Sequence, residues 1–385
     1  MIKVTDRSKC SGCTACFAVC PHKAISMKPD RLGFRYPEVD MDICTDCGLC
    51  EKVCDFVRTS SLPFVFPEEV RVTAVRNRDA GVLAASQSGG VFSALAKVVI
   101  NEGGVVYGAA FDPDFTVSHK RADSIAGCEA FHGSKYVQSE MGDVFIRVRK
   151  DLETGRKVLF SGTPCQVAGL VSYIPERLRE GLLTVDFICH GVPSPNVWKD
   201  YLAYMSRKGR ISSVCFRDKS AGGWKEHKES FIFEDGRKVF RETYKVLFYK
   251  NVMLRHSCAA CPYDLGRRKG DVLIADFWGV EEILPGFDGD QGTSMVITMS
   301  DNGRMLLEAA SSDLDIEPAA VSSDFISRRN PNLMRPARIY HERQMFEEVY
   351  PEKGFVYAAR RWGDIGWRYK AWQIKVFIRK ITGRK

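Results

Sequence analysis

The stretch from Cys10 to Cys20, CSGCTACFAVC, followed by Pro21, constrains this chain more than any other feature. Its spacing, C-x2-C-x2-C-x3-C-P, is the run that holds 4Fe-4S cubanes in bacterial ferredoxins. The run repeats without a gap 34 residues later, at Cys44, Cys47, Cys50 and Cys54. The first part of the chain is therefore an internal duplication, and it predicts a two-cluster ferredoxin-like domain over residues 1–57.

The spacing also predicts which cysteines share a cluster. Three thiolates two residues apart surround one face of a cubane, while the fourth cysteine of each run projects toward the other cluster. The two expected ligand sets are Cys10, Cys13, Cys16 and Cys54, and Cys44, Cys47, Cys50 and Cys20. Zinc and disulfides are the alternatives, but zinc sites rarely use this rhythm and nothing else in the sequence indicates an oxidising compartment. Asp55 replaces the proline after the second run, which changes the turn more than the ligands.

Composition places the chain among ordinary globular proteins. It has 385 residues, 45% of them hydrophobic, which is enough for two or three domains with a buried core. The first ten residues contain no apolar segment of a secretory signal, and no apolar run reaches the length of a membrane span. Fourteen cysteines without an export signal indicate a reducing compartment, so we expect a cytoplasmic protein.

The net charge of +8 belongs to the C-terminal tail. Residues 360–385 contain nine Lys or Arg and one Asp, so the rest of the chain balances to zero. No nucleic-acid recognition motif accompanies this charge, and we expect no nucleic-acid partner. A helix from Trp367 would place apolar residues on one face and basic residues on another, as in helices that lie on anionic membranes. A terminal helix packed on the body or on a partner is the alternative that we favour over peripheral membrane contact.

The remaining chain has the pattern of an α/β (mixed α+β) protein. Residues 58–70 contain two prolines and are expected to form a linker. Strands and helices then mostly alternate, which favours a sheet that is at least partly parallel. A hairpin-like run is expected at residues 211–241. We expect a mixed-sheet domain over residues 71–330 and a C-terminal extension over residues 331–385.

Four further cysteines have surroundings that indicate chemistry. Cys165 lies after an expected strand and at the start of a helix, where the dipole favours a thiolate, and Cys189 follows the next strand. Cys258 and Cys261 form a C-x2-C pair before Pro262. Four thiolates would suit a third cubane, but spacing alone leaves open a nucleophilic Cys165, a zinc half-site or a redox pair.

Two cysteines have no such surroundings. Cys128 lies in a helical pattern and Cys215 in a strand pattern. Both are expected to be small buried hydrophobic residues rather than ligands.

Several motifs together resemble a known family. SQSGGVFSAL, GSKYVQS, SGTPCQVAGL, CHGVPSP, CAACPY and GDVLIADFWG follow one another over most of residues 70–300. In this order they resemble the family of the beta subunit of coenzyme F-420-reducing hydrogenase and dehydrogenase, here fused to a two-cluster ferredoxin. The resemblance implies an FAD, and a third 4Fe-4S cluster held by Cys165, Cys189, Cys258 and Cys261. It also covers reductases that act on chlorophyll intermediates, so the terminal substrate varies within the family.

The residues themselves indicate a flavin site less strongly than the resemblance does. A serine and glycine turn before a helix offers free N–H groups to a diphosphate, although such a turn is more often only a helix cap, and no G-x-G-x-x-G fingerprint is present. Lys135 and Tyr136 could lie beside the flavin or on a solvated loop. His190, next to Cys189, is the candidate for hydrogen bonding near the isoalloxazine or substrate. The candidate flavin-binding residues are Ser86, Ser88, Gly89, Gly90, Lys135, Tyr136 and His190.

The predicted function is that of an iron-sulfur flavoprotein oxidoreductase. Clusters carry single electrons and flavin converts them to hydride, so the combination would connect a ferredoxin-type carrier or a redox partner subunit to a small organic acceptor. Coenzyme F-420 is one such acceptor, and a sugar-linked or quinone-like acceptor is another. The alternative is a non-catalytic electron-transfer adaptor of a larger complex. A third hypothesis makes Cys165 a covalent nucleophile, but the sequence offers no matched base.

Overall fold

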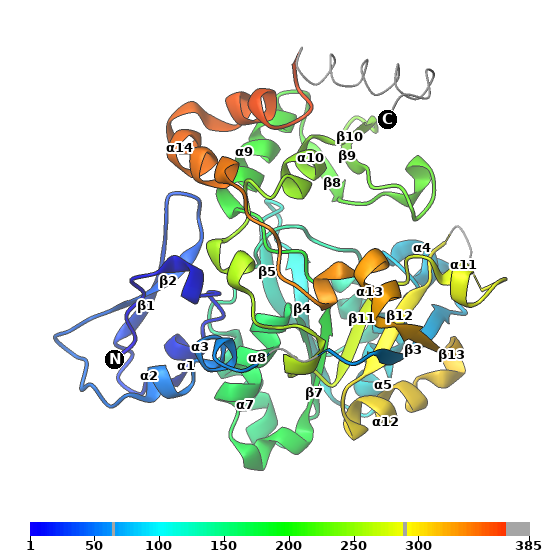
Figure 1. The fold of residues 1–385 in the computed structure, drawn as a ribbon, viewed down its shortest axis with the longest axis horizontal. Helices are drawn as coiled ribbons and strands as arrows, with labels where there is room; N and C mark the ends of the chain where they lie inside the picture. The colour runs from blue at the N-terminus through cyan, green and yellow to red at the C-terminus, as the bar shows by residue number, and fades with distance from the viewer. Residues whose placement is uncertain (64–65, 288–290, 367–385) are drawn as a thin grey trace.

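The computed structural model describes residues 1–63, 66–287 and 291–366 (Figure 1). The helix expected from Trp367 onward lies outside these residues. In the part of the chain that is described, no helix is both long and apolar enough to cross a membrane.

The N-terminal region consists of a hairpin and short helices that follow the cysteine runs. Strands β1 (Ile25–Pro29) and β2 (Arg35–Val39) pair antiparallel, with Ile25 opposite Val39. Helix α1 (Ala15–Val19) belongs to the first cysteine run and α2 (Leu49–Lys52) to the second. Helix α3 (Asp55–Ser60) continues three residues into the segment that we expected to be linker.

An eight-stranded mixed sheet forms the centre of the remaining chain. Its order is β13-β3-β12-β11-β7-β6-β4-β5. Strands β11, β7, β6 and β4 are mutually parallel, whereas β5, β12, β3 and β13 pair antiparallel with their neighbours. The strands span Glu69–Asn77 (β3), Val105–Phe111 (β4), Val117–Ala122 (β5), Val158–Gly162 (β6), Leu182–Phe187 (β7), Val272–Asp276 (β11), Ser294–Thr298 (β12) and Leu314–Ser322 (β13).

Helices cover both faces of this sheet, because the side chains of its central strands alternate between two apolar faces. Val105 and Val158 pack with α7 (Val144–Glu153) and α8 (Pro164–Tyr173). Their neighbours Val106 and Leu159 pack on the opposite face with α5 (Val91–Asn101) and α12 (Asp301–Ala309). The shorter helices are α4 (Ala80–Ala85), α6 (Ile125–Cys128), α11 (Val280–Ile283) and α13 (Ser323–Arg329). This arrangement confirms the predicted α/β class.

A second, aromatic-rich core lies beside the main sheet. The run expected as a hairpin is a three-stranded antiparallel sheet of β8 (Ile211–Cys215), β9 (Glu229–Phe233) and β10 (Lys238–Arg241). It packs with α9 (Pro195–Ser206), α10 (Thr243–Tyr249) and α14 (His341–Arg361), as Figure 1 shows. Trp198 of α9 and Phe355 of α14 belong to the same buried cluster. The C-terminal extension is therefore, up to Trp362, part of this core.

Candidate functional site

The two cysteine runs share an unusual backbone conformation. Gly12 and Thr14, on either side of Cys13, have φ of 73° and 73°. Asp46 and Gly48, at the equivalent positions of the repeat, have φ of 49° and 74°. Alternation with left-handed residues turns successive N–H groups toward one concave side, and such nests bind phosphates and Fe–S clusters. The duplication is thus visible in the backbone as well as in the cysteine spacing.

The first expected ligand set comes together as one group of buried thiols. Burial, together with the nearby thiols of Cys54, Cys165 and Cys10, raises the pKa of Cys13 to about 12. Burial likewise raises the pKa of Cys16, with Cys13, Cys10 and Cys54 contributing. Cys54, from the second run, therefore lies with the first run, as the crossed assignment requires. We call Cys10, Cys13, Cys16 and Cys54 the inner set.

The second expected set lines a small cavity of its own. Its four cysteines are Cys20, Cys44, Cys47 and Cys50. The backbone N–H of Ile2 donates to Cys50 Sγ at 3.2 Å, and that of Ala24 donates to Cys20 Sγ at 3.3 Å. Cys47 is exposed. We call these four cysteines the outer set, because one of its thiols reaches the surface.

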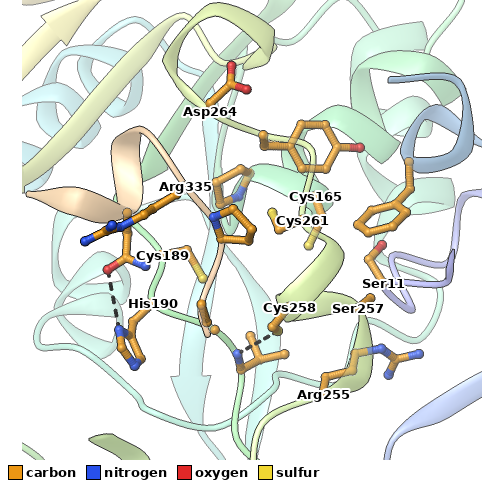
Figure 2. A pocket seen from close by; sticks show the side chains of 18 of the residues that line it. Ser11, Cys165, Cys189, His190, Arg255, Ser257, Cys258, Cys261, Asp264 and Arg335 are labelled. Carbon is orange, nitrogen blue, oxygen red and sulfur yellow. Dashed lines mark hydrogen bonds between the residues drawn. The ribbon is translucent and has the colours of Figure 1, made fainter. Parts of the chain in front are cut away.

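The third set converges on a separate cavity from three distant parts of the chain (Figure 2). Cys165 stands in the first turn of α8 and Cys189 follows β7, both at the carboxyl edge of the parallel strands. Cys258 and Cys261 come from the turn of 3-10 helix at residues 256–260. Burial raises the pKa of Cys258 to about 11 and that of Cys261 to about 12, with Cys165 contributing in both cases.

The donor sets fit 4Fe-4S clusters on three observations. All fourteen cysteines are free thiols. Each run has the alternating left-handed residues that form a nest of backbone N–H groups. Sulfur atoms in the outer and third sets accept backbone N–H bonds, including one from Val192 to Cys258 Sγ at 3.3 Å, and such bonds stabilise cluster thiolates. The cysteines of the outer and third sets line two separate cavities, whereas Cys128 is buried in the main core and Cys215 ends strand β8.

A compact contact joins the inner set to the third set. Phe56 of α3 packs edge-on against Tyr263, with ring centroids 5.9 Å apart. Cys54 of the inner set and Cys165 and Cys261 of the third set all pack against this pair. The inner set therefore lies next to the third set, and of the three sets only the outer one has an exposed cysteine.

His190 lies next to the third set, as expected from its position after Cys189. Its Nε2 is 2.6 Å from Asn251 Oδ1, and its Nδ1 is 3.4 Å from Asn332 Oδ1 (Figure 2). Its ring contacts Phe248 at 4.9 Å between centroids. The short hydrogen bond to Asn251 Oδ1 fixes the orientation of the imidazole beside the cysteines.

The serine and glycine turn is held against the sheet. A Cβ at Gly89 would lie 2.1 Å from the carbonyl oxygen of Val75, so only glycine fits there. Gly89 N–H already donates to Ser294 Oγ at 2.9 Å, and Ser88 Oγ donates to the Thr293 carbonyl at 2.8 Å. Packing therefore accounts for Gly89. Gly90, with φ of 72°, caps α5, and the hydroxyl of Ser86 lies beside it.

Lys135 and Tyr136 are desolvated rather than on a solvated loop. Burial lowers the pKa of Lys135 to about 7, and its Nζ donates to the carbonyls of Ala130 and His132. Tyr136 packs against His227 and Phe248, with ring centroids 5.1 Å and 5.0 Å away.

Two cations that were not among the predicted site residues, Arg217 and Lys219, contact the candidate flavin-binding residues. Arg217 donates to Asp276 Oδ2 at 2.6 Å, and its charge lowers the pKa of Tyr136 while burial raises it. Lys219 donates to the Leu83 carbonyl at 2.8 Å and the Ser88 carbonyl at 3.4 Å. Both follow β8, which no motif marks; only the position of Asp276 in the motif GDVLIADFWG pointed here.

The comparisons with known proteins agree with this architecture. Residues 155–323 match the family described as the C terminus of the beta subunit of coenzyme F420 hydrogenase/dehydrogenase. Residues 9–56 match the 4Fe-4S dicluster domain. A chain in the F420-reducing [NiFe] hydrogenase complex from Methanosarcina barkeri has a TM-score of 0.51 and 16% identity, over 74% of this chain and 93% of that one. At that identity the likeness shows the fold alone.

Two curated relatives match parts of the chain. One subunit of the F(420)H(2) dehydrogenase of Methanosarcina mazei is 26% identical over 209 residues, which cover 49% of this chain and 57% of the relative. An uncharacterized ferredoxin of Methanocaldococcus jannaschii is 35% identical over 51 residues, 13% of this chain and 65% of the relative. The matched segments thus span less than two thirds of either relative.

Proposed function

We propose that this chain is an iron-sulfur flavoprotein oxidoreductase. Residues 155–323 match the family of the beta subunit of coenzyme F420 hydrogenase/dehydrogenase, and residues 9–56 match the 4Fe-4S dicluster domain. The protein would pass electrons between a ferredoxin-type carrier or partner subunit and a small organic hydride acceptor. The proposal includes a third cluster at Cys165, Cys189, Cys258 and Cys261, and one FAD.

One continuous series of contacts supports the flavin. It begins at His190 beside the third set and passes through Phe248 to Tyr136. From Tyr136 it reaches Arg217, which is paired with Asp276; the same carboxylate attracts Lys219, whose ammonium contacts the Ser88 carbonyl. An elongated dinucleotide needs an aromatic and polar end near the redox partner and a cationic end for its phosphates. This series has both.

The roles of the chain's own residues follow from these positions. Lys219 and Arg217 would neutralise the diphosphate, and Tyr136 would pack against the ring system. His190, held by Asn251, would orient a polar edge of the ring or of the acceptor close to Cys189. When bound, the clusters would supply single electrons, and the flavin would combine two of them with a proton for transfer as hydride.

Anaerobic analysis of iron, sulfide and flavin tests this proposal. Three cubanes and one flavin predict about twelve irons, about twelve sulfides and one FAD per chain. Reduced protein should then transfer hydride to an acceptor from an anaerobic screen that includes coenzyme F-420, followed by reoxidation of the flavin absorbance. About eight irons and no flavin after anaerobic purification and reconstitution would contradict the proposal.

That result would favour the second candidate, a non-catalytic electron-transfer adaptor. The surface around the outer set supports it, because apolar side chains there face solvent: Met41 is 61% exposed, Ile43 47% and Leu49 39%. Exposed apolar residues around a redox centre are typical of docking surfaces for redox proteins. The two candidates differ in one measurement: an adaptor supplied with a chemical reductant turns over no acceptor without its partner.

A further inference from the structure

Arg255 is a fully buried cation in contact with the inner set. It is 0% exposed. Its Nε donates to the Cys10 carbonyl at 2.9 Å, and its Nη2 lies 3.8 Å from Cys10 Sγ. We propose that Arg255 is the built-in counter-charge of the inner cluster, and that it raises the reduction potential of this cluster enough for it to accept electrons from the outer one.

The guanidinium has neutral partners only, among those the structure describes. Besides Cys10, it donates to the Arg35 carbonyl at 2.9 Å and to Gln138 Oε1 at 3.0 Å, and its Cζ lies 4.2 Å from the centroid of the Tyr36 ring. Within the described residues, no hydrogen bond or ion pair joins it to a carboxylate. A buried charge without a counter-charge is strongly destabilising. A four-thiolate iron-sulfur cluster is anionic, so the inner cluster itself supplies the missing negative charge.

The loop around Cys13 is shaped to admit this cation. A Cβ at Gly12 would lie 2.9 Å from Arg255 Nη1 and 3.0 Å from its Cζ, and the positive φ of Gly12 independently favours glycine. The repeat offers an internal comparison, because the position equivalent to Gly12 is Asp46, an exposed carboxylate. At the repeat, this carboxylate is paired with the N-terminal ammonium of Met1 at 2.7 Å, so an uncompensated buried cation is found only at the inner set of the two duplicated sites, within the described residues.

The charge matters because no cysteine of the inner set is exposed. Reduction adds a negative charge to a cluster, and burial in a low-dielectric interior disfavours added charge. Burial alone would thus make the inner cluster harder to reduce than the outer cluster, whose Cys47 is exposed. A cation in contact with Cys10 stabilises the reduced form. Arg255 also stands three residues before Cys258 and lines the cavity of the third set (Figure 2), so it contacts both the inner and the third sets.

The test is a redox titration of the complete, cluster-loaded protein, followed by EPR under anaerobic conditions. A Cys47→Ser variant, with its altered signal, identifies the outer cluster. For Arg255→Gln we expect the reduced-to-oxidised ratio of the inner cluster at a fixed potential to fall about tenfold, which for one electron is about 59 mV. The outer cluster should not change. Arg255→Lys should retain most of the potential, because it keeps the charge, and Lys28→Gln, which removes an exposed charge from β1, should change neither cluster.

If the reduced-to-oxidised ratio of the inner cluster in Arg255→Gln stays within twofold of wild type at the same potential, with iron content intact, the proposal is overturned. An equal loss in Arg255→Lys would overturn it as well, since geometry rather than charge would then be responsible. If Arg255→Gln fails to assemble the inner cluster, Gln138→Glu provides the test, because it places a carboxylate at the atom that now accepts from Nη1. The inner potential should fall again, and an unchanged potential would contradict a role for the charge. These readouts need no flavin, so they are independent of the proposed hydride chemistry.

Discussion

Gly169 of α8 lies directly against the thiol of Cys13, so that a Cβ at residue 169 would approach Cys13 Sγ to 2.7 Å and its Cβ to 3.0 Å. The main domain therefore contacts the inner set at a residue, Gly169, that has no side chain. We predict that Gly169→Ala displaces Cys13 and lowers the iron content by about four atoms, the share of one cubane. Overpacking of this kind costs about 1–3 kcal/mol, so thermal stability should fall as well.

Gly127→Ala in α6 is the matched control, because its new methyl group would meet Ala122 and Ser124 rather than a cysteine. It should keep the full iron content. A Gly169→Ala protein with a normal inner-cluster EPR signal would show that the close approach to Cys13 is not important for the cluster.

The third set can be tested by removing one of its thiols. We predict that Cys189→Ser loses about four irons while the EPR signals of the inner and outer clusters persist, because the ligand sets do not share cysteines. Cys215→Ser, at the half-buried end of β8, should leave the iron content unchanged. Equal iron in Cys189→Ser and wild type would exclude a third cluster ligated by Cys189.

Lys219 is expected to act on the phosphates of the flavin. We predict that Lys219→Met weakens FAD binding at least tenfold, since a charge-assisted hydrogen bond contributes about 1.5–3 kcal/mol. Riboflavin, which has no phosphate, should bind both proteins alike. Titration of the flavin-free protein by fluorescence quenching measures both affinities, with the exposed Lys199→Met of α9 as control. If Lys219→Met weakens riboflavin binding as much as FAD binding, Lys219 does not act on the diphosphate.

The cysteine sets could be predicted from the sequence because their geometry is local. Ligands two or three residues apart surround a cubane whatever the rest of the chain does, and the repeat supplied the crossed fourth ligand. The third set was harder, since Cys165, Cys189 and Cys258 are far apart in sequence. Cys165 and Cys189 follow parallel strands, which end at one edge of the sheet. Cys258 lies in a 3-10 turn instead, and only its C-x2-C spacing with Cys261 marked it.

The cations around the flavin candidates and at the inner set could not be predicted in this way. Arg217, Lys219 and Arg255 are three of 56 Lys or Arg residues, and nothing in their local sequence distinguishes them from solvated side chains. Their role depends on burial, which only the tertiary fold decides. Gly89 shows the reverse case: its place in a glycine turn suggested a phosphate contact, but its close packing on Val75 already accounts for it.

A last prediction concerns Glu229, which is 1% exposed in the aromatic core. Burial raises its pKa from 4.5 to about 7, although the Lys245 N–H at 2.6 Å and the Tyr201 hydroxyl at 2.8 Å both donate to it. The folded state therefore holds a proton that the unfolded chain loses near pH 4.5. This contribution to stability is complete below pH 4.5 and is lost as the pH rises through 7. It amounts to about 3 kcal/mol at most, from the size of the shift.

Glu229→Gln removes this titration and keeps one acceptor oxygen for the Lys245 N–H, while its new amide NH2 can donate to the Tyr201 hydroxyl. We expect its Tm, measured anaerobically on the cluster-loaded protein, to rise relative to wild type as the pH is raised from about 5 to about 8. Glu234→Gln, an exposed carboxylate beyond the end of β9, should follow wild type across the range. A constant difference in Tm between Glu229→Gln and wild type would mean that Glu229 is already ionised in the fold at pH 5, with Lys245 N–H and Tyr201 compensating its burial completely.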